Sequence, residues 1–262
     1  MDLGISGRRA LVLGGNRGIG YGIAKALVAE GVHVAIAARD ADRLRSAAAE
    51  LQATSTADVT TAQIDLARTD DIATSAATLT ARFGPIDILV NNTGGPAYGG
   101  AAGRPLDEWR NRFEDMVLSV IALTDCLLPG MRARRWGRIL TVISSGVIQP
   151  IPILAISNSL RASLVGWSKT LSGEVAADGV TVNVLVPGRI DTERVRLTDE
   201  ATAQKEKISV AEAARRSAAT IPIGRYGTVD EIAAVAACVV SQPAGYMTGS
   251  MVRVDGGIVR SW

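Results

Sequence analysis

The chain has 262 residues, of which 47% are apolar and 4% aromatic, so it is long enough to bury a large aliphatic core. A net charge of +2 does not favour nucleic acid as a main partner. Two cysteines, Cys126 and Cys238, are too few and too far apart for a disulfide framework. Because both fall in apolar stretches, we expect buried thiols.

The sequence carries no signal that predicts export or membrane contact. The N-terminus lacks a basic-then-apolar leader, and no apolar run approaches the length that spans a bilayer. The basic run at residues 132–138 is interpreted as a solvated surface turn. We therefore expect a soluble, cytoplasmic protein that binds neither membranes nor nucleic acid.

Strand-like and helix-like runs alternate along the first half of the chain. Short β-rich apolar runs predict strands at residues 10–15, 33–39, 61–66 and 87–92. Runs with helical spacing or alanine-rich composition predict helices at residues 18–31, 42–53 and 69–83.

The second half repeats this alternation and indicates the fold class. It predicts strands at residues 137–144, 180–188 and 249–257 and a helix at 160–176. Near-continuous apolar strands separated by helices are typical of a parallel sheet that is covered on both faces. No repeat or linker interrupts them, so we predict an α/β fold, a single doubly wound Rossmann-type domain over residues 1–262. Ligands of such domains bind at the carboxyl ends of the strands.

A glycine-rich turn, GGNRGIG, follows the first predicted strand. The glycines at 14, 18 and 20 permit a tight turn and let backbone N–H groups approach a pyrophosphate at a helix N-terminus. An ordinary strand–helix connection can also use glycines, but this turn lies between a clear strand and a clear helix. We predict nucleotide binding by the residues of this turn, which are Gly14, Asn16, Arg17, Gly18, Ile19 and Gly20.

With this turn and the motifs that follow, the chain resembles the short-chain dehydrogenase/reductase family over nearly its whole length. NNTG (91–94) is similar to the family's Asn-Asn-Ala-Gly, and PGRIDT (187–192) to its Pro-Gly segment. IPIGRYGTVDEIA followed by MTGSMVRVDGG is similar to its C-terminal signature, and the whole sequence is similar to 3-oxoacyl-carrier-protein reductases. The resemblance implies further contacts to a nicotinamide dinucleotide from Asp65, Leu66, Asn92, Gly94, Pro187, Gly188, Ile190 and Thr192.

The second predicted strand ends in a pattern that favours NADP(H) over NAD(H). A carboxylate recognises the ribose 2′-hydroxyl best, whereas arginine recognises a 2′-phosphate. Ala38 stands where NAD-preferring members of the family tend to carry an acid, and Arg39 comes next. Arg17 is a second cation within reach, and Asp40 is expected to cap the following helix.

The resemblance implies catalysis by a Ser, a Tyr and a Lys, often with an Asn, and here the sequence departs from the family. Ser145 lies in the position of the catalytic Ser. The stretch LVGWSKTL sets the register of the next helix, in which Ser157 occupies the Tyr position and Arg161 the Lys position. Met116 stands where the Asn is expected. A serine hydroxyl is a far weaker acid than a phenol, and arginine keeps its proton in proteins. The usual proton path is therefore missing.

Several roles are open for these positions. Arg161 can hydrogen-bond the cofactor ribose, as the family's Lys also does, and Ser157 can be a small filler. Tyr98, in a glycine-rich loop, is a candidate substitute acid.

We predict an atypical NADP(H)-dependent oxidoreductase that acts on a small carbonyl or alcohol, with Ser145, Ser157 and Arg161 in the catalytic positions. One alternative is a non-redox enzyme, such as a lyase or isomerase, that keeps the nucleotide as a structural element. Another is a catalytically silent NADP(H)-binding sensor. The cofactor motifs do not separate these three.

The sequence also suggests what the protein binds besides the nucleotide. A buried charge on Arg161 needs a partner, which favours an anionic substrate, with Arg189 or Arg194 assisting. The family forms homodimers and homotetramers. The apolar face of the helix at 160–176 and the terminal Trp262 predict a homotetramer or homodimer here. We expect no metal ion.

Overall fold

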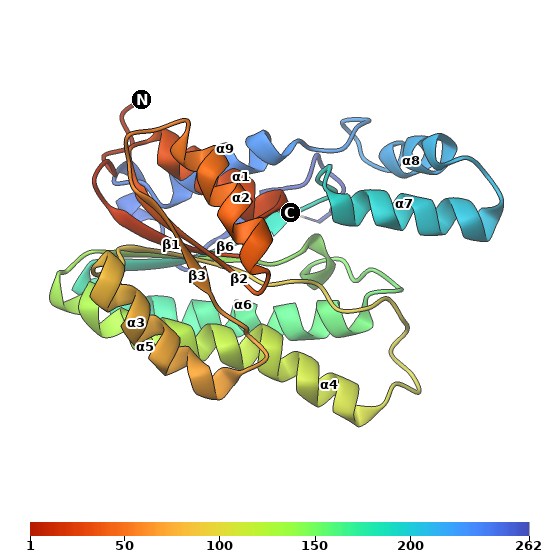
Figure 1. Ribbon diagram of the computed structural model, residues 1–262. Helices are drawn as coiled ribbons and strands as arrows, with labels where there is room; N and C mark the ends of the chain where they lie inside the picture. Colours follow the sequence, from red (N-terminus) through yellow and green to blue (C-terminus); the bar gives the residue numbers. More distant parts are fainter. Residues whose placement is uncertain (262) are drawn as a thin grey trace.

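Seven parallel strands form one twisted sheet in a computed structural model that describes residues 1–261 (Figure 1). The strand order is β3-β2-β1-β4-β5-β6-β7, so the direction of winding reverses between β1 and β4. The strands are β1 (Arg9–Leu13), β2 (His33–Ala38), β3 (Val59–Gln63), β4 (Ile88–Asn92), β5 (Gly137–Val142), β6 (Val180–Pro187) and β7 (Met251–Val254). The predicted doubly wound α/β fold is confirmed.

Helices cover both faces of the sheet. One face carries α1 (Gly18–Ala29), α2 (Ala41–Gln52) and α9 (Val229–Val239) (Figure 1). The other carries α3 (Ile72–Phe83), α5 (Ser119–Ala133) and α6 (Ala155–Val175). Beyond the carboxyl ends of the strands lie α4 (Leu106–Phe113) and the packed pair α7 (Glu193–Glu206) and α8 (Val210–Ala218).

The central strands are apolar throughout because successive side chains enter two different cores. On β1, Ala10 and Val12 pack in the core under α1 and α9, whereas Leu11 and Leu13 pack in the core under α3 and α5. Side chains of a strand alternate between its faces, and both faces of this sheet are covered. An alternating apolar–polar pattern is therefore absent from β1.

The third strand is displaced from its predicted bounds, whereas the predicted cap of the helix before it is correct. β3 lies at 59–63 rather than 61–66, because its register is set by pairing with β2, where Val34 faces Val59. Asp65 instead begins a turn, and its Oδ1 accepts a hydrogen bond from the N–H of Ala67 at 3.1 Å. The predicted cap is confirmed, since Asp40 accepts from two N–H groups at the start of α2.

Three predictions of burial were wrong. Cys126 and Cys238 are both exposed, because each lies on the outward face of a helix whose neighbouring positions point inward. The basic run at 132–138 is a surface turn only in its first half. Trp136 and Arg138 are buried, and Arg138 binds the backbone carbonyls of Gly137 and Ser241.

One helical run among residues 1–261 has the length and composition of a membrane span, contrary to the sequence-based expectation. It covers Leu106–Ala133, and half of its most apolar window is buried inside the molecule. Its later part, α5, packs against α3. Core helices of this kind meet the same length and hydropathy criteria as membrane spans. Trp262, which entered the prediction of assembly, lies outside the described residues.

Candidate functional site

The turn between β1 and α1 can be built only with glycine. Gly14 and Gly18 have φ angles of 61° and 55°, in the left-handed region that favours glycine. A Cβ atom on Gly20 would lie 2.3 Å from the carbonyl oxygen of Gly14 and 2.8 Å from Nδ2 of Asn92. The turn therefore packs directly against the end of β4.

The N-terminus of α1 is free to bind an anion. Arg17 precedes the helix, and no side chain in the described residues caps its first N–H groups. A Cβ atom on Gly18 would lie 3.6 Å from Cγ2 of Thr192, the residue before α7, which also begins without a side-chain cap. Two uncapped helix N-termini thus lie close together, and this arrangement fits the pyrophosphate of a dinucleotide.

The other predicted cofactor residues lie at the carboxyl edge of the same sheet. Arg39 follows β2, and Asp65 and Leu66 follow β3. Asn92 ends β4 and connects it to β1, because its Nδ2 donates to the carbonyl of Leu13 at 3.2 Å. The remaining predicted residues lie at or just after the ends of β4 and β6. They are Gly94, Pro187, Gly188, Ile190 and Thr192.

Arg17, one of the two cations predicted to bind a 2′-phosphate, is engaged in an ion pair. Its Nη1 donates to Oε2 of Glu193 at 2.6 Å, and this pairing lowers the pKa of the Glu193 carboxyl. Both side chains are more than half exposed, so the pair is weak and can open at little cost. Arg39 is exposed directly after the end of β2.

The three residues in the catalytic positions are all buried. Ser145 begins a short 3-10 turn after β5, and Ser157 and Arg161 lie on the first two turns of α6. The predicted spacing of one turn is correct, since Nε of Arg161 donates to Oγ of Ser157 at 3.3 Å.

The guanidinium of Arg161 joins the ends of two strands. Its Nη1 donates to the carbonyl of Val142, the last residue of β5, at 2.9 Å. Its Nη2 donates to the carbonyls of Thr93, at 3.2 Å, and Gly94, at 3.5 Å, directly after β4. Three of its four partners are therefore backbone oxygens, and Arg161 holds β4 and β5 together where the sheet opens.

Arg161 carries a charge that these contacts do not neutralise. Burial, assisted by the positive charge of Arg194, lowers its pKa to about 10. This value is well above neutrality, so the guanidinium stays protonated. All four hydrogen bonds go to uncharged oxygens. The charge of Arg161 is therefore not neutralised by an acid, as expected. Its N–H groups, however, already donate to oxygens of the protein.

Met116 lies in a π-helical turn, residues 114–118, between α4 and α5. Its side chain is buried in an apolar cluster that includes Val120, Ile156 and Leu160. A thioether in such surroundings cannot hold a relay water, because it has no N–H or O–H to donate and is only a weak acceptor. π-Turns inside α-helices are frequent at functional sites.

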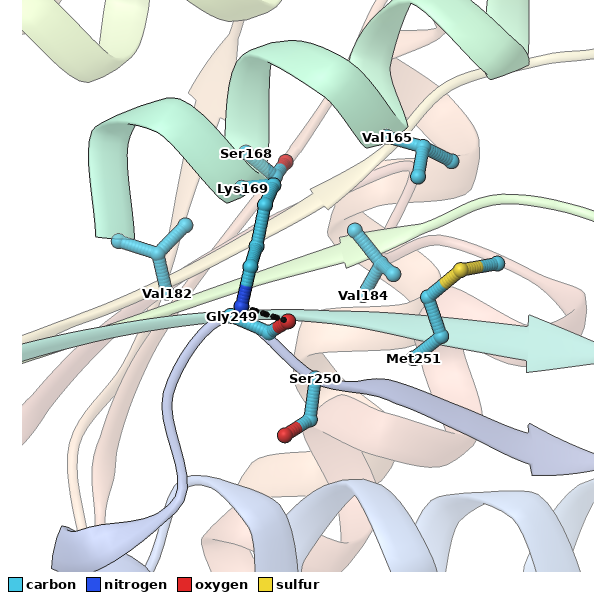
Figure 2. A pocket seen from close by; sticks show the side chains of 8 residues that line it. All are labelled: Val165, Ser168, Lys169, Val182, Val184, Gly249, Ser250 and Met251. Atoms are coloured by element: carbon cyan, nitrogen blue, oxygen red, sulfur yellow. Dashed lines mark hydrogen bonds between the residues drawn. The ribbon is translucent and has the colours of Figure 1, made fainter. Parts of the chain in front are cut away.

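Two other side chains of the kinds that the family uses for proton transfer, a Tyr and a Lys, are engaged elsewhere. The hydroxyl of Tyr98 is hydrogen-bonded to Thr198 of α7, and the guanidinium of Arg194 lies 5.1 Å from the centre of its ring. Lys169, the lysine of α6, lines a cavity of about 240 Å³ between α6, β6 and β7. Figure 2 shows it directed to the β7 end of that cavity, where Nζ donates to the carbonyl of Gly249 at 3.2 Å.

Sequence reasoning missed the partners of Arg161 and of Arg17. The Arg161 partners are carbonyls of Thr93, Gly94 and Val142, and any residue type supplies a carbonyl. The partner of Arg17, Glu193, did leave a signal, because it is the acid that follows Thr192 at the start of α7.

The geometry supports electrostatic stabilisation more than proton transfer. A fixed guanidinium and buried hydroxyls can stabilise negative charge that develops on a substrate oxygen. Neither a serine hydroxyl nor a guanidinium loses its proton near neutral pH, so neither is a good general acid there. The side chains of this site are therefore better suited to stabilising an oxyanion than to transferring a proton.

The chain is similar to known reductases in both sequence and structure. The sequence profile of a family described as enoyl-(acyl carrier protein) reductase matches residues 14–259. The chain is 33% identical over 259 residues to the 3-oxoacyl-acyl-carrier-protein reductase FabG of Salmonella typhimurium, which covers 98% of this chain and 99% of the relative.

Two solved structures add information on cofactor and catalytic centre. L-sorbose reductase from Gluconobacter frateurii, solved with NADPH and L-sorbose, has a TM-score of 0.95 and 32% identity over 100% of both chains. A short-chain oxidoreductase from Pseudomonas aeruginosa PAO1, described as containing an atypical catalytic center, has a TM-score of 0.90 and 28% identity. That likeness covers 99% of this chain and 100% of the neighbour.

Removal of the Arg161 guanidinium should destabilise the protein. In Arg161→Gln the carbonyls of Val142 and Thr93 lose their donors, and we expect a loss of about 2–4 kcal/mol in the free energy of unfolding. Ser157→Ala leaves only Nε without an acceptor and should cost less, about 1–2 kcal/mol. Urea unfolding measures both. Equal stabilities of Arg161→Gln and the wild type would show that Arg161 does not hold the strand ends.

Proposed function

Because the chain belongs to the short-chain dehydrogenase/reductase family, we propose that it is an atypical NADP(H)-dependent oxidoreductase of a small carbonyl or alcohol. We propose further that residues 1–262 act as one domain, with Ser145, Ser157 and Arg161 in place of Ser, Tyr and Lys. The observation that carries the proposal is the glycine turn with two uncapped helix N-termini, next to a site whose proton-transfer groups are replaced.

The residues at the carboxyl edge fit the cofactor. The N–H groups at the start of α1 and α7 would bind the pyrophosphate, and the segment Pro187–Thr192 would lie along the nicotinamide side. Arg39, with Arg17 once it leaves Glu193, would bind the 2′-phosphate. When bound, NADP(H) supplies or accepts a hydride.

On the substrate side, the chain's own groups stabilise charge. Ser145 would donate a hydrogen bond to the substrate oxygen, and the positive potential of Arg161 would stabilise an alkoxide. Water or an acidic group of the substrate would provide the proton, since neither serine is paired with a general base.

An anionic group on the substrate would balance the buried positive charge of Arg161. Arg161 is buried without a carboxylate partner in residues 1–261, and the nearby charge of Arg194 further disfavours its protonated form. A carboxylate or phosphate next to these two cations would relieve both effects. The guanidinium of Arg194 donates hydrogen bonds to the carbonyls of Gly95 and Pro96 near the surface. From this position the side chain can turn toward a ligand.

A silent nucleotide-binding role is the second candidate, favoured by one observation. The donors of Arg161 are occupied by protein carbonyls, so the guanidinium serves the fold even if no reaction takes place. Tight cofactor binding without turnover on any substrate would support this role or a non-redox reaction.

We also propose that the protein assembles as a homotetramer or homodimer through α6 and β7. β7 is the last strand of the sheet order, and Met251 on it is 40% exposed. Met251 and Val165 line the cavity of Figure 2 beside this strand edge. A second copy would cover the unpaired edge and the apolar side chains next to it.

Cofactor preference tests the assignment of Arg39. We expect NADPH to bind more tightly than NADH, and Arg39→Asp to weaken NADPH binding about tenfold or more by removing a charge-assisted hydrogen bond. Arg45→Asp, on the exposed side of α2, is the control and should change little. Titration by fluorescence measures the affinities, and equal affinities of the wild type for the two nucleotides would refute the preference.

The proton argument predicts weak or no reduction of ordinary ketones by the wild type. General acid catalysis is worth roughly a hundredfold to ten-thousandfold, and that factor should be missing. Ser157→Tyr combined with Arg161→Lys and Met116→Asn should raise ketone reduction by about a hundredfold, provided that NADPH affinity shows an intact fold.

The assay follows NADPH absorbance with simple ketones. Rapid wild-type turnover that persists in Ser145→Ala and Arg161→Gln would contradict the proposal. Either the assignment of Ser157 and Arg161 to the Tyr and Lys positions or the absence of a general acid would then be wrong.

Assembly is tested by light scattering at micromolar concentration. The wild type should have the mass of a dimer or tetramer, and Val165→Asp should reduce it by placing a charge in the proposed contact. Leu197→Asp, on an exposed apolar position of α7, should leave the mass unchanged. A monomeric wild type would rule the proposal out.

A further inference from the structure

A second cavity, with charged side chains in its wall, lies between the helix pair α7–α8 and the body of the molecule. Its volume is about 260 Å³, and its walls come from α7, α8, the loop after β6 and Ile153 before α6. Figure 1 shows this helix pair extending past the carboxyl edge of the sheet. Ile153 and Thr198 in its wall both contact the loop after β4, which also supplies carbonyl partners to Arg161. The cavity therefore adjoins the candidate active site.

Two opposite charges line this cavity without forming a pair. Arg189 donates to the hydroxyl of Ser217, and no salt bridge joins it to an acid within residues 1–261. Asp199 is 4% exposed, and its two oxygens accept from the hydroxyl of Tyr226 at 3.0 and 2.9 Å. No cation pairs with this carboxylate within residues 1–261, so its remaining acceptor capacity is open to a ligand.

The other charged side chains of the cavity neutralise each other at its rim. Arg216 lies 3.3 Å from Glu206 and 2.7 Å from Glu212. A ligand in the cavity therefore meets one unpaired cation, Arg189, and one unpaired anion, Asp199.

We propose that this cavity binds a small zwitterion of the α-amino acid class, with its carboxylate on Arg189 and its ammonium on Asp199. A purely anionic ligand would be repelled by Asp199, and a purely cationic one by Arg189. Only a ligand with both charges forms two charge-assisted hydrogen bonds. Drug-sized ligands need cavities of about 300–1,000 Å³, so this one suits a smaller molecule. The inference rests on the proposed function in that the zwitterion would be part of the substrate.

Binding to the full chain without nucleotide tests the site itself. The twenty proteinogenic amino acids are screened by thermal shift, and affinities are measured by calorimetry. For each amino acid that binds, the acid lacking the ammonium and the amine lacking the carboxylate are the matched probes. We expect both analogues to bind about tenfold more weakly or worse. Absence of binding by every amino acid, or equal binding of the analogues, would overturn the proposal.

Variants locate the binding. Asp199→Asn keeps the shape of the side chain and should weaken amino acid binding about tenfold or more, as should Arg189→Gln. Arg216→Gln, at the neutralised rim, is the control and should bind normally. NADPH affinity reports whether each variant is folded. If Asp199→Asn fails to fold, the half-buried Arg189→Gln carries the test, and unchanged amino acid binding in it overturns the proposal.

A final measurement, NADPH formation, distinguishes an amino acid that is a substrate from one that only binds. Serine and threonine combine the zwitterion with an oxidisable alcohol, from which a hydride would pass to NADP+ and the hydroxyl proton to water, leaving a carbonyl. NADPH formation with either one supports both the site and the proposed function. Amino acid binding without NADPH formation supports the site and refutes its role in the substrate. NADPH binding without amino acid binding refutes the site alone.

Discussion

The hydrogen bonds from Arg161 to the backbone carbonyls at the ends of β4 and β5 determine what the candidate site can do. They hold two central strands together at the point where the sheet opens toward a ligand. The same contacts fix a positive charge inside the molecule and leave it without a carboxylate partner in residues 1–261. Arg161 thus stabilises the fold and also sets the electrostatic potential of the site. A substitution of Arg161 alone changes both and cannot separate the two roles.

The two halves of the site differ in how closely they follow the family. On the nucleotide side, the glycine turn, the uncapped start of α1 and the segment from Pro187 to Thr192 keep the features that a dinucleotide needs. On the substrate side, the catalytic positions predicted from the sequence hold Ser157 and Arg161. A guanidinium can stabilise an oxyanion but cannot release a proton near neutrality. The structure therefore favours reactions in which the protein stabilises charge and the solvent or the substrate supplies the proton.

Local patterns made much of this predictable from the sequence. Buried parallel strands are apolar throughout, so the fold was predicted correctly. The register of α6 is encoded over a few residues, so the spacing of Ser157 and Arg161 was also predicted correctly. What failed depended on distant partners. Backbone carbonyls have no residue signature, so the contacts of Arg161 were missed, and Arg17 pairs with Glu193 across 176 positions. Cys126 was misplaced because an apolar helix still has one face toward solvent. The cavity under α7 and α8 arises only when these helices pack on each other and against the loop after β6.

Hydrogen exchange at the Arg161 side chain tests the central claim most directly. With ¹⁵N-labelled arginine, the Nε–Hε resonance of Arg161 is assigned by its loss in Arg161→Lys, and its exchange with water is measured with and without NADP+. The contacts to Ser157 and to the strand ends predict slow exchange in both states, far slower than for the surface arginines. Exchange as fast as that of the surface arginines, or protection that appears only with NADP+, would contradict the account, since Arg161 would then be a ligand-binding group without a part in holding the sheet.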